Sequence, residues 1–483
     1  MRAKVSKYVA VAIAFIFCCM LAGRPNVARS ADAAKAPADK KVFRAGAATA
    51  NITPRIGLPT VGGWKPVPST HIHDELHVRC LVLDNGETRL GIAICDNLGI
   101  PRDVLDEAKD QVSEKVGLPV DHVLTAATHT HSSVSVHGSG DYTKLLIGRI
   151  VDGLQTAIHN LEPARIGWGL ASEPTQVFNR RWLMKPGEHL RNPFGGMDKA
   201  RMNPPRRSPD LIKPAGPTDP QVPFITVRAL DGRPIALLAN YSLHYVGGVE
   251  RGAVSADYFA MFADRIQQLL KADRLDPPFV GIMTNGTSGD INNIDFQGEP
   301  KRFDRYEKMR QVANLVAEKV AQAHGKVKFH DWVPLGAVRR ELTLKVRKPT
   351  EEQMAWAKEL SARTGEAKDH LEHRQRVYAR RFKQLAEAPD EIDIVLQAMR
   401  IGDVGIAAIP FETFCEIGLE LKAKSPLART FVVSFGNGSR GYLPTPRHFE
   451  LGGYETWLGT NRVELQTAPK IIQAQLEMLG ELR

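Results

Sequence analysis

The segment THTHSS, residues 128–133, places His129 and His131 one residue apart, directly after the apolar run 123–127. Two imidazoles with this spacing, on a loop that leaves a strand, can point at one centre or lie on either side of it. Neutral imidazole nitrogen is a good zinc ligand, and a His-x-His pair is a common start to a zinc site. A polar strand end with two solvated histidines fits the segment equally well. The choice depends on whether the chain supplies further ligands.

Four further segments are unusually polar or glycine-rich for their surroundings. They are NYSLHY at 240–245, NGTSGDIN at 285–292, PFET at 410–413 and GSRGY at 438–442. The glycine-rich loop can turn backbone N–H groups toward a ligand and expose a serine, although GTSG lacks the G-x-S-x-G spacing of an α/β-hydrolase nucleophile. Each segment also has a purely structural explanation: a core histidine, a tight turn, an acidic first helical turn or packing aromatics. Each signal is weak by itself.

The elements that must position these segments alternate between strands and helices. Two apolar runs around a short turn predict hairpins at 76–83 with 90–95, at 224–230 with 234–241, and within 392–409. Apolar residues at helical spacing predict helices that begin near Pro101 and that cover 142–161, 257–272, 303–324 and 470–482. Single strands are predicted at 43–52, 279–283 and 430–435. The order predicts an α/β fold, a single domain over residues 43–483 with mixed sheets, β-hairpins and flanking helices.

Two segments interrupt this pattern. Residues 185–222 are rich in Pro, Gly and Arg and show no periodicity, which predicts an irregular insertion that serves as a lid, a binding loop or a surface feature. Residues 350–390 are heavily charged at helical spacing, which predicts an exposed helical hairpin with a solvated surface and no chemistry.

The first residues have the pattern of a signal peptide, residues 1–30. A basic start is followed by an apolar core at 8–23 and by small residues around Ser30, after which cleavage is expected. The alternative is a retained membrane anchor, but the apolar run is short for a spanning helix and Arg24 and Pro25 follow it. Residues 31–42 are predicted to be a flexible leader. The mature protein is therefore expected to be exported, either periplasmic or secreted.

Charge and cysteine content exclude some classes. Loss of the five basic residues in 1–30 lowers the net charge from +10 to about +5, which does not indicate nucleic acid as a partner. The remaining excess of positive charge is compatible with an anionic substrate or with an encounter with a membrane surface. The mature chain contains Cys80, Cys95 and Cys415, which do not form a disulfide framework, although a Cys80–Cys95 bridge stays open.

Taken together and in order, the motifs resemble those of the neutral/alkaline, non-lysosomal ceramidase family, zinc-dependent amidases that split ceramide into sphingosine and a fatty acid. The resemblance rests on AGAATANITPRIGLPTVGGW, ATHTHSS, FNRR, NYSLHYVGG, VSADYFA, NGTSGDIN, IPFETF and GYLPTP with GGYE. The resemblance covers nearly the whole mature chain and therefore implies that residues 43–483 are a ceramidase-like catalytic domain. The metal ligands that it implies are His129, His244, Glu412 and Tyr442.

The same resemblance implies roles for four more residues. His131 and Arg180 match positions that line the reaction centre, Tyr454 matches a tyrosine that stabilises the oxyanion, and Ser288 matches a serine proposed as nucleophile or substrate-orienting group. The implied activity is hydrolysis of the N-acyl amide of ceramide or a related lipid by water activated on Zn²⁺. The implied partner is thus a small-molecule or lipid N-acyl amide.

The sequence departs from the family at two motifs and at its end. His131 is followed by Ser132-Ser133-Val134 where ceramidases usually have S-G-P, and GDIN is followed by Asn293 instead of proline. The family's C-terminal immunoglobulin-like domain is expected to be absent. These departures leave open a zinc hydrolase of another N-acyl amide or an ester on the same scaffold, and also a non-catalytic binding relative.

Overall fold

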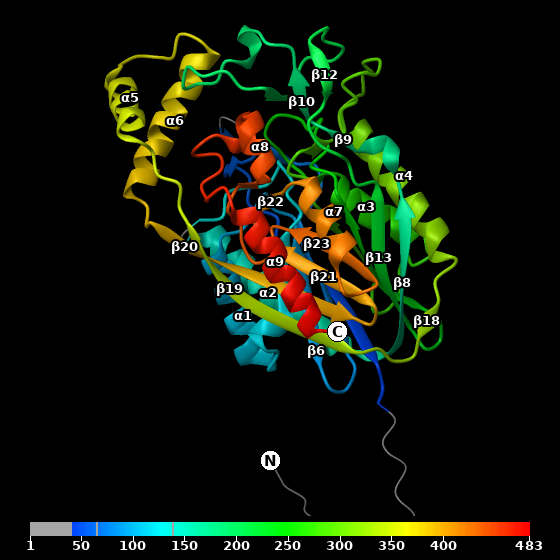
Figure 1. Cartoon of the computed structure of the whole chain (residues 1–483). Coiled ribbons are helices and arrows are strands. Elements are labelled where there is room, and N and C mark those ends of the chain that lie inside the picture. Colours follow the sequence, from blue (N-terminus) through cyan, green and yellow to red (C-terminus); the bar gives the residue numbers. More distant parts are fainter. Residues whose placement is uncertain (1–40, 64–65, 138–139) are drawn as a thin grey trace, which may run out of the picture. The chain divides into compact units, whose positions relative to one another are not determined.

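The computed structural model describes residues 41–63, 66–137 and 140–483 (Figure 1). The largest sheet among these residues has nine strands. Its strands follow the order β16-β14-β13-β8-β1-β5-β6-β7, and β18 pairs with β8. The bounds are β1 Arg44–Asn51, β5 His77–Asp84, β6 Arg89–Cys95, β7 Val123–Ala127, β8 Glu162–Ser172, β13 Gln221–Ala229, β14 Pro234–Tyr241, β16 Val280–Asn285 and β18 Phe329–His330.

A second sheet of four strands packs against the first. Its order is β19-β20-β21-β23, with β19 Leu335–Lys345, β20 Glu391–Ile401, β21 Val404–Ile409 and β23 Arg429–Ser434. Leu81 and Ile92 of the larger sheet share one apolar core with Ile406 and Phe431 of the smaller one. Because side chains alternate along a strand, the opposite face of each sheet is left for helices to cover.

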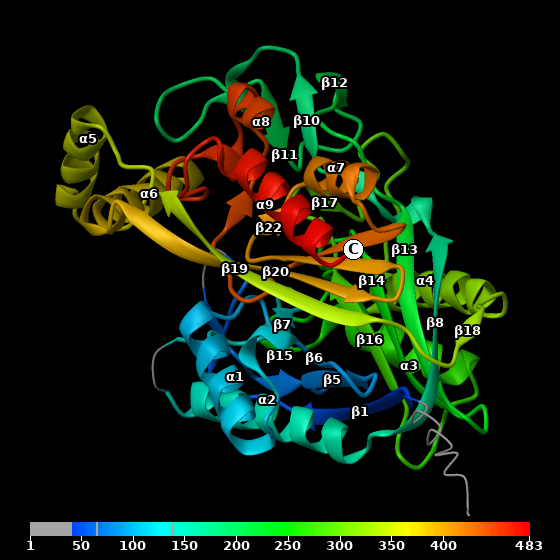
Figure 2. The ribbon, with the colours of Figure 1, turned by 60° about the horizontal axis from the view of Figure 1, so that its bottom comes forward.

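Helices cover these outer faces (Figure 2). On the larger sheet, α1 Arg102–Val116 and α2 Asp141–His159 pack on the half formed by β1, β5 and β6, whereas α3 Asp257–Leu269 and α4 Glu307–His324 pack on the half formed by β13, β14 and β16. On the smaller sheet lie α7 Cys415–Lys424 and α9 Thr467–Glu481. The predicted α/β class, with mixed sheets and flanking helices, is confirmed.

The three predicted hairpins are present as the antiparallel pairs β5–β6, β13–β14 and β20–β21. Short elements complete the loops around the sheet ends: β2 Pro59–Thr60, β3 Val67–Pro68, β4 His71–Ile72, β9 Phe178–Asn179, β15 Ala253–Val254, β17 Ile291–Asn292, β22 Glu412–Thr413, β24 Tyr442–Leu443 and α8 Pro446–Leu451. Glu412 and Thr413 form the short strand β22, and α7 begins just after it at Cys415. Cys80, Cys95 and Cys415 are buried free thiols, so the Cys80–Cys95 bridge is not formed.

The two interrupting segments are ordered. Within 185–222, β11 Ala200–Met202 and β12 Leu211–Pro214 flank β10 Arg181–Met184 in a three-stranded sheet, so this segment is not wholly irregular. Its strands are too short to leave a periodic pattern in the sequence.

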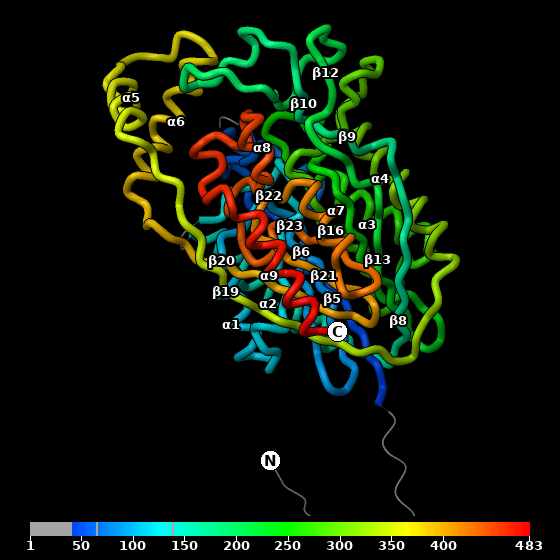
Figure 3. Tube along the Cα trace, in the orientation of Figure 1, coloured from blue at the N-terminus to red at the C-terminus, as the bar shows by residue number. Residues whose placement is uncertain are grey.

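Residues 350–390 form a helical hairpin of α5 Glu351–Ala362 and α6 His370–Glu387, and Thr350 closes a capping box at the start of α5. Figure 3 shows this yellow hairpin beside the red C-terminal segment, where Phe382 and Leu458 belong to one apolar cluster.

The predicted signal peptide and residues 31–40 of the leader lie outside the described residues. In the part that is described, no helix is both long and apolar enough to cross a membrane.

Candidate metal centre

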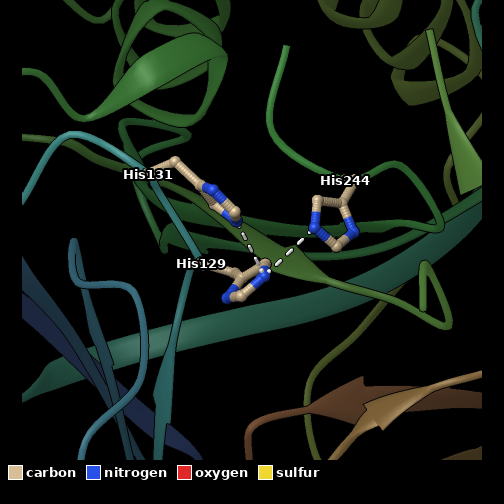
Figure 4. A group of neighbouring side chains, drawn as sticks. All are labelled: His129, His131 and His244. Atoms are coloured by element: carbon tan, nitrogen blue, oxygen red, sulfur yellow. Dashed lines mark hydrogen bonds between the residues drawn. The ribbon is translucent and has the colours of Figure 1, made fainter. Parts of the chain in front are cut away.

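Three imidazoles meet at one point, as Figure 4 shows. Nε2 of His129 lies 3.1 Å from Nε2 of His131 and 3.1 Å from Nε2 of His244. His129 and His131 follow β7, and His244 follows β14, so two distant strands deliver the cluster. His129 is 3% exposed and His131 is half-buried, so the two histidines of this segment are not a pair of solvated side chains at a strand end, and His244 is 1% exposed. The three side chains form a group that could hold a metal ion.

The far nitrogen of each imidazole is fixed by a backbone carbonyl. Nδ1 lies 2.5 Å from Leu98 O in His129, 3.0 Å from Gly62 O in His131 and 3.0 Å from Ser288 O in His244. A carbonyl only accepts hydrogen bonds, so each Nδ1 carries the proton and donates it. Each neutral ring therefore presents an unprotonated Nε2 to the centre, as metal-ligating histidines do.

Three converging lone pairs repel one another unless a cation lies among them. A proton does not stay among the three rings at rest, because burial and then the neighbouring His129 hold the pKa of His131 well below its usual value, so this ring is neutral and can take up a proton only transiently. Burial, followed by Arg180, lowers the pKa of His244 in the same way. Zinc–nitrogen bonds of 2.0–2.1 Å in a tetrahedral site separate the nitrogens by about 3.3 Å, close to the spacing seen here.

Aromatic rings and strained backbone hold the imidazoles in place. His129 has a left-handed backbone with φ 74°, an unusual conformation for a residue with a side chain, and its ring stacks on Phe435 at 4.2 Å. The ring of His131 stacks on Tyr245 at 3.7 Å. Gly62, with φ 101°, lies so close that a Cβ there would sit 2.6 Å from the Cβ of His131.

Glu412 reaches the same centre from β22, the short strand that follows β21 of the smaller sheet. Its Oε2 lies 3.5 Å from Nε2 of His129 and 3.8 Å from Nε2 of His244. This oxygen is buried and has no hydrogen-bond partner. An orphaned carboxylate oxygen beside imidazole lone pairs fits a metal ligand, because a bound cation would satisfy both. The residues present thus fit the metal that the sequence resemblance implies.

Tyr442 lies beside Glu412 because β22 and β24 pair in parallel with these two residues in register. Its hydroxyl accepts a hydrogen bond of 3.0 Å from Nη2 of Arg180. Burial raises the pKa of the phenol, and the positive charge of Arg180 opposes that rise. Tyr454 meets Tyr442 edge to face, with ring centroids 5.8 Å apart.

Arg180 is a buried guanidinium that bridges three parts of the site. Its Nη2 also donates to Gly289 O at 2.8 Å, and its Nε donates to Oε1 of Glu455 at 3.3 Å. Burial alone lowers the pKa of Arg180, but Tyr442 and Glu455 outweigh it and raise the pKa above its usual value. Arg180 is therefore a permanent positive charge next to the candidate ligands. Glu455 also pairs with Arg181, and both of these side chains are fully buried.

Ser288 contacts the histidine cluster with its backbone carbonyl, whereas its hydroxyl is bonded elsewhere. Its carbonyl accepts the hydrogen bond from His244, whereas its Oγ donates to Oδ1 of Asn285 at 2.7 Å. Nδ2 of Asn285 in turn donates to Thr128 O at 3.1 Å. An amide oxygen is not a base, so this arrangement does not activate the serine as a nucleophile.

All eight residues implied by the sequence resemblance surround this centre. Several residues that hold the histidines in place were not predicted from the sequence. Gly62 and Tyr245 lie inside the quoted motifs, so the sequence carried a signal for them. Phe435 ends a predicted strand, and Leu98 contributes only a carbonyl, which no side-chain pattern reveals.

A cavity of about 600 Å³ opens at this centre, and Glu412, Tyr442 and Tyr454 form part of its lining. This volume lies within the range of ligand pockets, about 300–1,000 Å³. The cavity gives a small molecule access to the candidate ligands.

Comparison with known proteins places this α/β architecture among the ceramidases by fold. No protein-family model and no curated protein matched the sequence. The structure is similar to that of neutral ceramidase from Pseudomonas aeruginosa, with a TM-score of 0.68 and 16% identity over 91% of this chain and 74% of that one. A ceramidase complexed with C2 matches with the same TM-score and identity over 92% of this chain and 76% of that one. The chain has the fold of the neutral ceramidases, so the resemblance drawn from the motifs is confirmed at the level of fold.

Proposed function

We propose that this protein is a zinc-dependent amidohydrolase that resembles neutral ceramidase and cleaves the N-acyl amide of ceramide or a related lipid. One observation carries the proposal. The unprotonated Nε2 atoms of His129 and His244 and the orphaned Oε2 of Glu412 converge within 3.8 Å of one another, next to a cavity large enough for a ligand. The fold shared with neutral ceramidases supports the same conclusion.

In this proposal His129, His244, Glu412 and Tyr442 hold the metal. His131 is not a ligand in this proposal: its Nδ1 donates to Gly62 O, and its Nε2 lone pair accepts a proton during the reaction. A bound zinc ion supplies Lewis acidity and lowers the pKa of bound water to about 7.

The chain supplies the remaining requirements of amide hydrolysis. Arg180 and Tyr454 are the donors for the oxyanion, and one well-placed donor contributes on the order of 2.7–4 kcal/mol. His131 accepts the proton of the attacking water at Nε2 and passes it to the leaving amine. The hydrogen bond from Ser288 to Asn285 favours water over the serine hydroxyl as the nucleophile.

Metal analysis combined with a substrate panel tests the proposal. We expect one zinc ion per chain, and hydrolysis of N-acylsphingosines that stops with a chelator and returns with zinc. Turnover only of simple esters, or only of amides without a lipid acyl chain, would identify a different hydrolase on the same scaffold. Stoichiometric zinc without any hydrolysis, or no zinc at all, would contradict the proposal and favour a binding protein.

His131→Gln separates the two roles open to this imidazole. With His131 as the proton carrier, the variant keeps one zinc ion per chain and loses turnover. Loss of zinc from this variant would make His131 a ligand instead.

We also propose that the protein is exported after cleavage near Ser30. The basic start, short apolar core and small residues of 1–30 support this. N-terminal sequencing of protein from the native cell tests it, and an intact Met1 would contradict it.

A further inference from the structure

Three arginines line the cavity beside the candidate metal centre. Arg381 comes from α6, Arg440 from the loop before β24, and Arg462 from the loop before α9. We call this space, defined by these three residues together with Glu412 and Tyr442, the arginine cavity. The elements that form it are distant in sequence, so no single motif announces it.

The backbone fixes the arginines close to the candidate ligands. The backbone N–H of Arg440 donates a hydrogen bond to Pro410 O at 2.9 Å. Pro410 lies two residues before Glu412 and Arg440 lies two residues before Tyr442, so this bond continues the β22–β24 pairing. Next to Arg462, Nδ2 of Asn461 donates to Tyr442 O at 3.1 Å. Nη1 of Arg381 donates to Oγ1 of Thr460 at 3.2 Å. The position of the positive charge relative to the metal centre is thus set by the fold.

The chain offsets the charge of the arginine cavity only in part: the charge of Asp103 acts on Arg440 without a direct ion pair. Among the described residues, no acidic side chain forms an ion pair with Arg381, Arg440 or Arg462, and the only acid in the lining is Glu412. Burial lowers the pKa of Arg462, and the nearby charges of Arg381 and Arg440 lower it further. Three like charges around one cavity cost free energy unless an anion offsets them.

Several arginines elsewhere in the molecule are neutralised by an ion pair. Arg102, Arg233 and Arg447, for example, each pair with a carboxylate. Arg381 and Arg440 are half-buried and Arg462 reaches solvent, so the cavity keeps its charge where a ligand can meet it.

Apolar side chains share the lining with the arginines. Leu98, Val346, Leu385 and Ile392 border the same space. A ligand that satisfies both parts of the wall is an amphiphile with an alkyl or acyl chain and an anionic group.

We propose that the substrate is an anionic N-acyl amide whose amine part carries a carboxylate or phosphate that Arg381, Arg440 and Arg462 bind. This proposal rests on the proposed function, since it names the class of amide. Arginine binds planar oxyanions through two parallel hydrogen bonds, and such charge-assisted bonds are stronger than neutral ones. The neutral head group of a ceramide leaves these arginines without a partner.

A matched trio of amides tests the proposal by binding. N-dodecanoylserine carries a carboxylate, N-dodecanoylserinol replaces it with a neutral hydroxymethyl group, and N-dodecanoylserinol phosphate carries a phosphate. Each is titrated calorimetrically into the full chain with a chelator present, so that no turnover occurs. We expect at least one anionic amide to bind about 10-fold or more tightly than the neutral one, with a preference that shrinks as salt rises. The anionic amide with the greater affinity identifies the oxyacid.

Two variants show whether the arginine cavity causes the preference for the anionic amides. Arg462→Gln should remove most of the preference for the anionic amides and leave the affinity for N-dodecanoylserinol unchanged. Arg380→Gln is the matched control, because Arg380 is exposed on the same helix as Arg381 but does not line the cavity. Equal affinity for all three amides, or an equal effect of both variants, overturns the proposal.

Turnover of the same amides by the zinc-loaded protein separates this proposal from the proposed function. If the neutral amide is hydrolysed as fast as the anionic ones, the amidase stands and the anionic substrate is wrong. If none is hydrolysed but the anionic amides bind through Arg462, the cavity stands and the amidase is wrong.

Discussion

The histidine cluster and the arginine cavity meet at Glu412, yet the chain treats them in opposite ways. Around the cluster, every imidazole Nδ1 has a carbonyl partner, and what remains unsatisfied is electron-rich: imidazole lone pairs and Oε2 of Glu412. In the cavity, what remains unsatisfied is positive charge on three arginines. The cluster therefore fits a cation and the cavity an anion.

The two regions also differ in how firmly their side chains are held and in how well a ligand can reach them. His129 is buried and held by stacking, a strained backbone and a hydrogen bond to Leu98 O, and His244 is buried and held by a hydrogen bond to Ser288 O, which suits groups that must keep one geometry. The arginine side chains reach the cavity space and can adapt to a ligand. We expect changes in the cluster to cost more than changes in the cavity.

The largest expected effect comes from removing an imidazole. His129→Ala deletes the nitrogen that lies nearest both of its neighbours, so we expect loss of stoichiometric zinc and a fall in amide turnover of at least about 10³-fold. Metal analysis and kcat/KM measure the two effects. His159→Ala, an exposed histidine on α2, should leave both unchanged. Retention of one zinc ion by His129→Ala would break the distinction between cluster and cavity.

Tyr442 lies on the border of the two regions, and its phenylalanine variant shows to which one it belongs. Tyr442→Phe keeps the ring beside Tyr454 and removes the oxygen that Arg180 contacts. As a metal ligand it should matter at least as much as an outer-shell partner, so we expect zinc affinity to fall about 10–100-fold. Competition with a chelator measures this. Unchanged zinc affinity with reduced turnover would instead place the phenol on the substrate side.

Gly62 tests how tightly the cluster is held. Gly62→Ala places a methyl group 2.6 Å from the Cβ of His131 at φ 101°, so the imidazole must shift. We expect kcat/KM to fall about 10-fold, less than the 10²-fold that a misplacement of 1 Å can cause. Gly57→Ala is the control, since φ is 100° there and open space surrounds the new methyl group. Both variants should lose about 1–3 kcal/mol of stability from backbone strain, and only Gly62→Ala should lose turnover. Equal turnover in the two variants would contradict the role given to Gly62.

The sequence predicted the histidine cluster far better than the cavity. His129, His244 and Glu412 each follow an apolar strand within a short recognisable motif, so a local pattern marks them. Arg381 lies in the charged segment 350–390, where helical spacing predicted the helix that α6 forms, and its place in the lining of the cavity left no mark in that pattern. Charge patterning cannot tell a solvated arginine from one that lines a cavity, because the difference depends on which distant loop packs opposite.

The fold shows the same limit. Strong turns such as Asp84-Asn85-Gly86 led to the correct hairpins, whereas β8 was missed although it lies within the larger sheet. Its sequence EPARIGWGLAS contains two glycines and a half-exposed face, so it lacks the apolar run of its neighbours. Pairing with β13 along nine residues makes it a strand, and that contact is not local.

The smallest expected effect concerns a buried lysine near the histidine cluster, whose lowered pKa should make the stability of the protein depend on pH. Lys109 is 0% exposed, and its Nζ donates to Oδ1 of Asn437 at 2.6 Å, two residues beyond the ring that stacks on His129. Burial lowers its pKa from the usual 10.5 to about 7. Between these values the unfolded chain binds one more proton than the folded chain, so stability rises with pH, by about 1.4 kcal/mol per unit.

Below pH 7 both states are protonated, and the charged lysine carries its full burial penalty. Lys109→Met should therefore reduce the increase in unfolding free energy between pH 7.5 and 8.5, measured by urea titration. Lys115→Met, at an exposed site near the end of the same helix, should keep the slope of the parent protein. An unchanged slope in Lys109→Met would mean that this cation keeps its usual pKa despite burial. Lys109 would then be a buried charged group that its hydrogen bond to Asn437 is sufficient to stabilise.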